Sequence, residues 1–348
     1  MTRFAPVSVL ALLVFTPTCA HADSLQAQIR QVFAGMQITS LDAGNSVTTP
    51  AIDGPGSPLP DGPIGSLNQV GTNVSNILSA PATPVNNLSQ TLTGQQTVVD
   101  NIVTSGSAHA LQQDGFNISN AASGNAFTGI LQYMDTSGSQ AVTNRAVVNN
   151  RLGQITQSGV NAANLLFATT SIDSAGQIIA PGAVQRVNNV LNVAHGGLKV
   201  VQSGANIGNA VIADKVDNVT RVFSGDQIVD NVLNFGAGAM PFSISQSGLN
   251  VANYVSAKDI GTLNQISTGS QTIRNSVVDG TLQAYTASTV GGTLTQQSNA
   301  NFVNVVVVPS AKRNGQTINI SQTANFTQTN TVSGGGSNQF GNVVSVSR

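Results

Sequence analysis

Hydrophobic and polar residues alternate along the chain in short runs that return at a nearly constant interval. The pattern [Ile/Leu/Val]-x-Gln-x-Gly-x-Asn occupies Leu67–Asn73, Leu111–Asn117, Ile155–Asn161, Val200–Asn206 and Ile244–Asn250, with a degenerate copy at Thr295–Asn301. Its Gln residues, at positions 69, 113, 157, 202, 246 and 297, lie 44, 44, 45, 44 and 51 residues apart. A period of this size is typical of repeat architectures, so we expect a stack of similar units.

A second pattern, Gln-x-[Val/Ile]-x-Asn-x-[Ala/Leu/Val], lies between successive copies of the first. It occupies Gln140–Ala146, Gln185–Leu191, Gln227–Leu233 and Gln271–Val277. A variant at Gln96–Ile102 has Asp100 where the other copies have Asn. Stretches rich in Gly and Ser precede several copies, as turns between strands do. Each repeating unit therefore contains at least two strands, whether it forms one large coil or two small ones.

Strand geometry places the Gln and Asn residues of each pattern on one face. In an extended chain Gln157, Gly159 and Asn161 point the same way, because successive side chains point to opposite faces. If equivalent strands stack in register at about 4.8 Å, each amide can donate to one neighbouring copy and accept from the other. The Gly between them leaves space for a facing sheet or for a bend. The predicted ladder residues are Gln69, Asn73, Gln113, Asn117, Gln140, Asn144, Gln157, Asn161, Gln185, Asn189, Gln202, Asn206, Gln227, Asn231, Gln246, Asn250, Gln271, Asn275, Gln297 and Asn301.

The predicted fold class is all-β, a repetitive β-solenoid or stacked β-arches with Asn/Gln ladders and units of about 44 residues. We assign residues 67–348 to this β-repeat domain, with an atypical C-terminal repeat that caps the stack. Residues 23–66, rich in Pro and Gly over their second half, are expected to be an export or linker segment. Within it, Ser24–Phe33 has apolar residues at helical spacing, which indicates a short amphipathic helix or a disordered export tag.

Residues 1–22 have the features of a secretory signal peptide. Arg3 supplies a positive charge, Val7–Phe15 an apolar stretch and Ala20-His21-Ala22 a cleavage site. No later segment has the roughly twenty apolar residues of a membrane helix, so we predict no membrane span in the mature chain. The expected localisation is secreted, either extracellular or at the cell surface.

Charged residues are scarce, at 8% of the chain, and all 14 acidic residues are Asp. The formal net charge of −1 offers no basic surface for nucleic acid, and we expect no nucleic-acid partner. Hydrophobic residues make up 40% of the chain, which favours a packed structure over the disorder that low-complexity sequences often show.

No group of residues predicts chemistry. His109 and His195 are the two histidines after the signal, and no Cys or Glu accompanies them as a zinc set. Asp214, Asp217 and the nearby Asp226 and Asp230 form the densest acidic cluster, but the calcium repeat of secreted β-helices is missing. We therefore predict no enzyme activity and no catalytic, cofactor or metal site, and interpret these residues as solvated.

Four arginines lie in or close to strands of the second pattern: Arg145, Arg186, Arg221 and Arg274. Charged residues that interrupt hydrophobic strands act as gatekeepers against aggregation. We interpret these arginines as gatekeepers that slow assembly until export is complete.

The segment Gln157-Ser158-Gly159-Val160-Asn161-Ala162-Ala163 and its sister copies resemble the repeats of secreted bacterial functional amyloids, the curlins and, more loosely, the Fap-type fibre subunits. The chain differs from the curlin pattern in having one residue fewer between Gln and Asn. The resemblance implies an extracellular fibre subunit that polymerises with itself and contributes to biofilm matrix, surface adhesion or aggregation. It also implies an outer-membrane secretion pore and a nucleator or anchor protein as partners.

Two other functions fit the repeats. A non-polymerising β-solenoid adhesin, attached to the cell surface, would contain the same ladders. A β-helix enzyme acting on polysaccharide would need Asp, Lys or Arg gathered in one groove, but Lys199, Lys215, Lys258 and Lys312 are scattered among different repeats. The fibre subunit is the preferred reading, the adhesin its main alternative.

Overall fold

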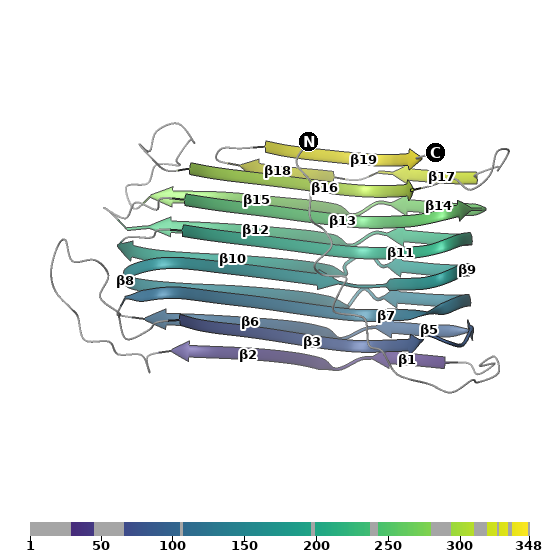
Figure 1. Cartoon of the computed structure of the whole chain (residues 1–348), viewed down its shortest axis with the longest axis horizontal. Helices are drawn as coiled ribbons and strands as arrows, with labels where there is room; N and C mark the ends of the chain where they lie inside the picture. Colours follow the sequence, from purple (N-terminus) through teal and green to yellow (C-terminus); the bar gives the residue numbers. More distant parts are fainter. Residues whose placement is uncertain are drawn as a thin grey trace.

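The computed structural model describes residues 29–44, 66–104, 107–195, 199–236, 243–279, 294–309, 319–325, 327–332 and 336–346. Within these ranges the regular elements are all β-strands, which form one large parallel sheet of 19 strands (Figure 1). The prediction of an all-β chain is confirmed. The predicted signal peptide and most of the Pro-rich linker lie outside the described residues.

The strands stack in three strand columns, each defined by parallel pairing between successive copies. The first column contains β1 (Ile29–Phe33), β4 (Val85–Asn86), β5 (Leu88–Leu92), β9 (Leu165–Ile179), β14 (Thr262–Ser267), β17 (Asn319–Ala324) and the C-terminal parts of β7 (Ala108–Met134) and β11 (Lys199–Phe223). The second contains β2 (Met36–Gly44), β6 (Gln95–Thr104), β10 (Val184–His195), β12 (Asp226–Phe235), β15 (Ser270–Asp279), β18 (Thr327–Val332) and the N-terminal part of β8 (Ser139–Ala162). The third contains β3 (Ser66–Ala80), β13 (Ser243–Ile260), β16 (Leu294–Val308), β19 (Gly336–Val346) and the remaining parts of β7, β8 and β11.

Strands that pair with each other in one column lie one sequence period apart. We call the strands at one level of the three columns a layer. Gln113 on β7 is in register with Gln69 on β3 and with Gln157 on β8. The longer last interval keeps the same register, since Gln246 pairs with Gln297. The residues that lengthen this interval therefore lie between Asp279, the end of β15, and Leu294, the start of β16, and are outside the described residues.

The first layer of the stack begins before the predicted boundary at residue 67. Ile29–Phe33 is the strand β1, paired with β5, and β2 pairs with β6. The predicted helix is therefore wrong over Ile29–Phe33. A helix of about ten residues is marginal without a packing surface, whereas a strand gains hydrogen bonds along the whole edge of β5.

The last layer also stays in register. Gln322 on β17 pairs with Gln265, and Gln328 on β18 pairs with Gln271.

The core forms where the apolar ends of the two sequence patterns meet. Leu111, Ile155 and the equivalent residues of the first pattern pack in one cluster with Ala146, Leu191 and the equivalent residues of the second. A larger cluster fills the space beside the first column and runs through successive layers from Val85 to Val308. The described residues contain no helix that is long and apolar enough to cross a membrane.

Amide ladders as the candidate functional site

The predicted Gln residues form two hydrogen-bonded ladders through the interior. In the first pattern, Nε2 of Gln113, Gln157, Gln202, Gln246 and Gln297 donates to Oε1 of the Gln one layer closer to the N-terminus, at 2.9, 2.8, 2.8, 2.7 and 2.5 Å. In the second, Gln96, Gln140, Gln185, Gln227, Gln271 and Gln328 do the same at 2.8, 2.9, 2.9, 2.9, 2.8 and 3.1 Å, beginning from Gln37. Most of these side chains are fully buried.

The predicted Asn residues form ladders that run in the opposite sense. Nδ2 of Asn73, Asn117, Asn161, Asn206 and Asn250 donates to Oδ1 of the Asn one layer closer to the C-terminus, at 3.0, 2.9, 2.9, 2.9 and 3.0 Å. Asn144, Asn189 and Asn231 do so in the second pattern, ending at Asn275, at 2.8, 2.7 and 2.8 Å. The predicted ladder residues are thus brought together.

Backbone carbonyls of the facing column accept the second proton of many amides. Gln157 Nε2 donates to the carbonyl of Asn144 at 3.2 Å, and Asn161 Nδ2 to that of Arg186 at 2.9 Å. A buried polar group left unpaired costs about 1–3 kcal/mol. Each amide therefore favours both the register with the adjacent layer and the spacing to the facing column at which its hydrogen bonds form.

Glycine in the first pattern allows the third column to approach the second closely. A Cβ on Gly115, Gly159 or Gly204 would lie 2.2, 2.4 and 2.4 Å from Cγ1 of Val142, Val187 and Val229. These valines, with Val98 and Ile273, form a continuous buried row. Of the two roles proposed for this Gly, the structure therefore supports close approach of a facing strand.

Sequence reasoning missed a third Gln ladder. Gln90, Gln132 and Gln177 donate from Nε2 to the preceding Gln at 2.6, 2.8 and 2.6 Å, beginning from Gln31, and Gln322 donates to Gln265 at 2.8 Å. Its signal is the short pattern apolar-x-Gln-x-apolar, as in Leu88–Leu92 and Ile29–Phe33.

A third Asn ladder, also missed, lies where the chain turns from the third column into the first. It runs in one direction through Asn76, Asn120, Asn164, Asn209, Asn253, Asn304 and Asn342, at 2.8, 2.9, 2.9, 2.8, 2.8 and 2.8 Å. Asn76, Asn120 and Asn164 have φ of 52°, 49° and 41°, a left-handed conformation that Asn tolerates better than most residues. The signal was a second Asn three residues after the Asn of each first pattern.

Asp100 stands at the start of the second Asn ladder in place of an Asn, with Leu41 in register on its other side. It is in register with Asn144, and both of its carboxylate oxygens and Asn144 Oδ1 are buried without a hydrogen-bond partner. Burial and, to a lesser extent, the charge of Asp114 raise the pKa of Asp100 to about 7. A protonated carboxyl can donate where Asn would, whereas a carboxylate can only accept.

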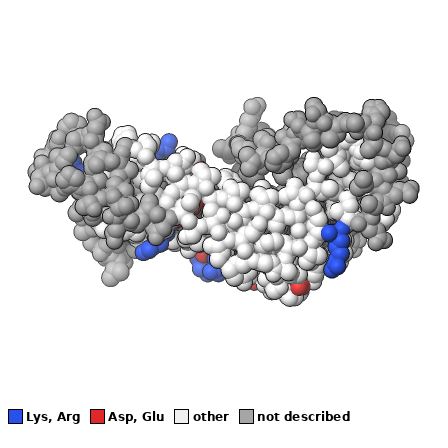
Figure 2. All heavy atoms as spheres, turned by 90° about the horizontal axis from the view of Figure 1, so that it is seen from below, with Lys and Arg blue, Asp and Glu red and all other residues white. Residues whose placement is uncertain are grey.

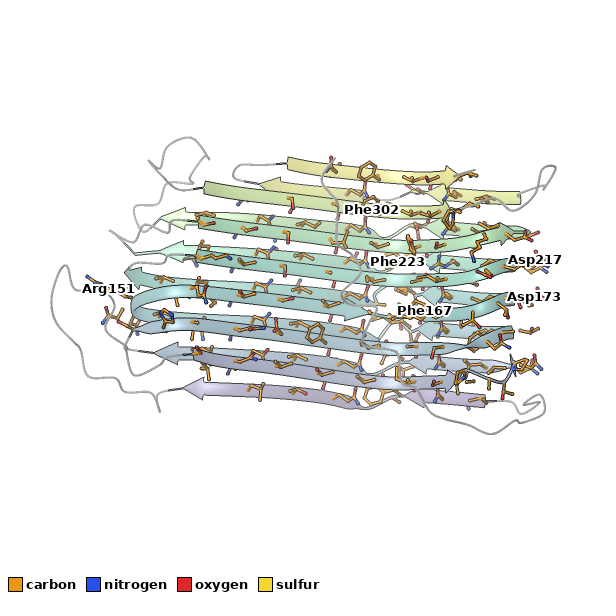
Figure 3. All side chains as sticks on the ribbon, in the orientation of Figure 1. Arg151, Phe167, Asp173, Asp217, Phe223 and Phe302 are labelled. Carbon is orange, nitrogen blue, oxygen red and sulfur yellow. The ribbon has the colours of Figure 1, made fainter. Side chains whose placement is uncertain are left out.

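The predicted acidic cluster is divided among separate contacts. Asp214 pairs with Lys258 at 2.7 Å, Asp230 lies 3.6 Å from Arg274, and Ser270 donates to Asp226 at 2.5 Å. Asp217 lies above Asp173 at one lateral edge (Figure 3) and accepts from the backbone N–H of Thr262 at 2.8 Å. In the described part of the chain, no group of three or more His, Cys, Asp or Glu is placed to hold a metal ion.

Three of the four predicted gatekeeper arginines are exposed, but Arg221 is not. Arg145, Arg186 and Arg274 point outward from the second column. Arg221 lies on β11 in the first column and is 0% exposed, so the gatekeeper interpretation is wrong for it. Its position corresponds to Gln in the layers on either side, which makes it a member of the third Gln ladder.

Comparison with known proteins gave no match: no family model matches the chain, and no curated protein or solved structure is significantly similar to it.

Proposed function

We propose that the chain is a β-solenoid with one turn per sequence repeat and that it acts outside the cell as a fibre subunit. Each repeat contributes one strand to each of three columns, which supports one large coil over two small ones. In this proposal, subunits add head to tail, and the fibre contributes to biofilm matrix or surface adhesion.

The observation that carries this proposal is the pair of unpaired strand edges at the two ends. Among the described residues, β1, β2 and β3 pair only with the layer that follows them, and β17, β18 and β19 only with the layer that precedes them. Such edges template the addition of further strands unless charge, Pro or a covering element blocks them.

The two ends are complementary. Because Gln amides donate towards the N-terminal layer, the first layer has Nε2 of Gln31 and Gln37 at its outer side and the last has Oε1 of Gln322 and Gln328. The third Asn ladder, which runs from Asn76 to Asn342, offers the reverse, an acceptor in the first layer and a donor in the last. A second copy stacked in parallel would extend these three ladders with donors facing acceptors, whereas the second-pattern Asn ladder stops short of both ends, at Leu41 and Val332.

Apolar side chains gather at the same ends. Of the nine large hydrophobic residues that are exposed in the described part of the chain, eight belong to the first or last layer; they are Val32, Met36, Ile38, Val70, Val74, Phe340, Val344 and Val346. Figure 2 looks onto the end that contains β1 and β2, where the described surface has few charged side chains. Phe340 also stacks on Phe302 of the preceding layer, with ring centroids 4.8 Å apart, as it could on a further layer.

The test is to incubate the purified chain from residue 23 to 348 without denaturant and to follow thioflavin fluorescence, electron microscopy and fibre diffraction. We expect fibres with a meridional reflection near 4.8 Å, the spacing of paired strands. A stable β-rich monomer that never elongates would overturn the fibre proposal and favour the surface-attached adhesin.

A further inference from the structure

The third Gln ladder has an arginine at one position where the other layers have Gln. Arg221 is in register with Gln177 on one side and Gln265 on the other. Its Nε donates to Gln177 Oε1 at 2.9 Å, as a ladder Gln would. Unlike Gln, however, the guanidinium has no acceptor to offer to the next layer.

Three N–H-bearing nitrogens are therefore left without partners at one place in the interior. Nη1 and Nη2 of Arg221 and Nε2 of Gln265 are buried and make no hydrogen bond. Closer to the N-terminus, Nε2 of Gln132 in the same ladder donates both to Gln90 and to the backbone carbonyl of Leu165, the latter at 2.9 Å. The unpaired donors at Arg221 and Gln265 therefore differ from the pattern of this ladder.

The guanidinium also lacks a counter-charge. Arg221 forms no ion pair with the acidic residues of the described chain, and burial lowers its pKa well below the usual range. Arginine nevertheless holds its proton in proteins, and an uncompensated buried cation is strongly destabilising. A stable stack needs a negative charge near this group.

We propose that Arg221 and Gln265 bind one small monovalent inorganic anion, such as chloride, inside the stack. The guanidinium supplies the charge and two donors, and Gln265 Nε2 a third donor from the adjacent layer. A spherical halide suits donors that arrive from two layers and carries only the one charge that Arg221 can neutralise. Bound there, it takes the place of the acceptor that Gln would provide, and the ladder continues across the arginine layer.

The experiment compares the full chain with Arg221→Gln, which restores a ladder residue, and with Arg274→Gln, which removes an exposed arginine. Each protein is unfolded in denaturant, refolded in sodium bromide, freed of excess salt by gel filtration, and assayed for retained bromide by elemental analysis. We expect about one bromide per chain for the native sequence and for Arg274→Gln, and none for Arg221→Gln, because binding to the folded state alone holds the anion.

Stability gives a second readout. The denaturant midpoint of the native chain should rise with the logarithm of bromide concentration at constant ionic strength, with fluoride, which is harder to dehydrate, as the balancing anion. Arg221→Gln should show no such rise and should be the more stable protein in fluoride alone. Equal bromide content and equal midpoint shifts in the native chain and Arg221→Gln would overturn the proposal. Both readouts use the folded subunit, so they do not depend on whether it forms fibres.

Discussion

At the scale of single residues, the ladders depend on which atoms can donate. Asn and Gln present a donor and an acceptor in one planar group and can therefore continue a row without limit. Asp100 and Arg221 each retain only one of these capacities, the acceptor in the ionised carboxylate and the donor in the guanidinium. Each leaves unpaired atoms on its neighbour, Asn144 or Gln265.

The raised pKa of Asp100 predicts a pH-dependent stability. The folded state favours the protonated carboxyl, so the stability is highest below the ordinary pKa of 3.8, falls as the pH rises towards about 7, and levels off above it. Asp114, whose own pKa burial raises, is the charged group that adds to this effect.

Replacing Asp100 by Asn should restore the ladder and remove this decline. At pH 8 we expect Asp100→Asn to raise the free energy of unfolding by about 1–3 kcal/mol, the cost of the buried atoms that are now unpaired, with little effect at pH 4. Urea unfolding at the two pH values measures the difference. Asp114→Asn, which leaves Asp100 in place, serves as the control and should keep most of the decline; a native-like pH profile in Asp100→Asn would contradict this account.

At the scale of elements, the close contact between the second and third columns depends on glycine. In Gly159→Ala the new Cβ would lie 2.4 Å from Val187 Cγ1 and 3.0 Å from Val142 Cγ1. Overpacking of this kind costs about 1–3 kcal/mol, and we expect a loss of that size in chemical denaturation.

Gly176→Ala is the matched control on β9, since its Cβ would meet no atom closer than Leu131 Cδ1 at 3.4 Å. It should change stability little. The cost of Gly159→Ala should also shrink in a Val187→Ala background, as a double-mutant cycle reveals. Equal costs at the two glycines, or no coupling with Val187, would show that the columns do not pack as described.

Much of the strand arrangement could be predicted from the sequence, because a ladder demands the same residue at the same interval. The Gln and Asn of the two long patterns were found in this way, and close approach of a facing sheet was one of the two roles predicted for the glycine. The first column was missed because its pattern, as in Ile130–Met134, has one polar residue between two apolar ones and contains no Asn or Gly. Arg221 then broke the row of Gln residues, and only the register of β11 with β9 and β14 identifies it as a ladder member.

At the scale of the whole molecule, the proposed fibre would grow through the two end layers. Val344 is 49% exposed on β19, in the last layer, whereas Leu131 is 42% exposed on β7, within the stack. A Lys at the end would be buried when the next copy is added, and lysines on edge strands oppose such pairing. We therefore expect Val344→Lys to lengthen the lag of fibre growth several-fold and Leu131→Lys to leave it nearly unchanged.

Thioflavin kinetics at equal protein concentration make this comparison, and circular dichroism checks that both variants fold. If the two substitutions slow growth equally, growth does not proceed through the end of β19. If neither does, the exposed apolar residues of the last layer take no part in assembly.

The opposed directions of the Gln and Asn ladders have an electrostatic consequence for length. Three rows of amide dipoles point one way along the stack and three point the other way, so their axial fields largely cancel, unlike the aligned peptide dipoles of an α-helix. A stack built in this way develops no growing charge separation between its ends. The energy of adding the next layer should therefore be independent of how many layers lie beneath it, and dipole repulsion sets no limit to how far the rows can extend.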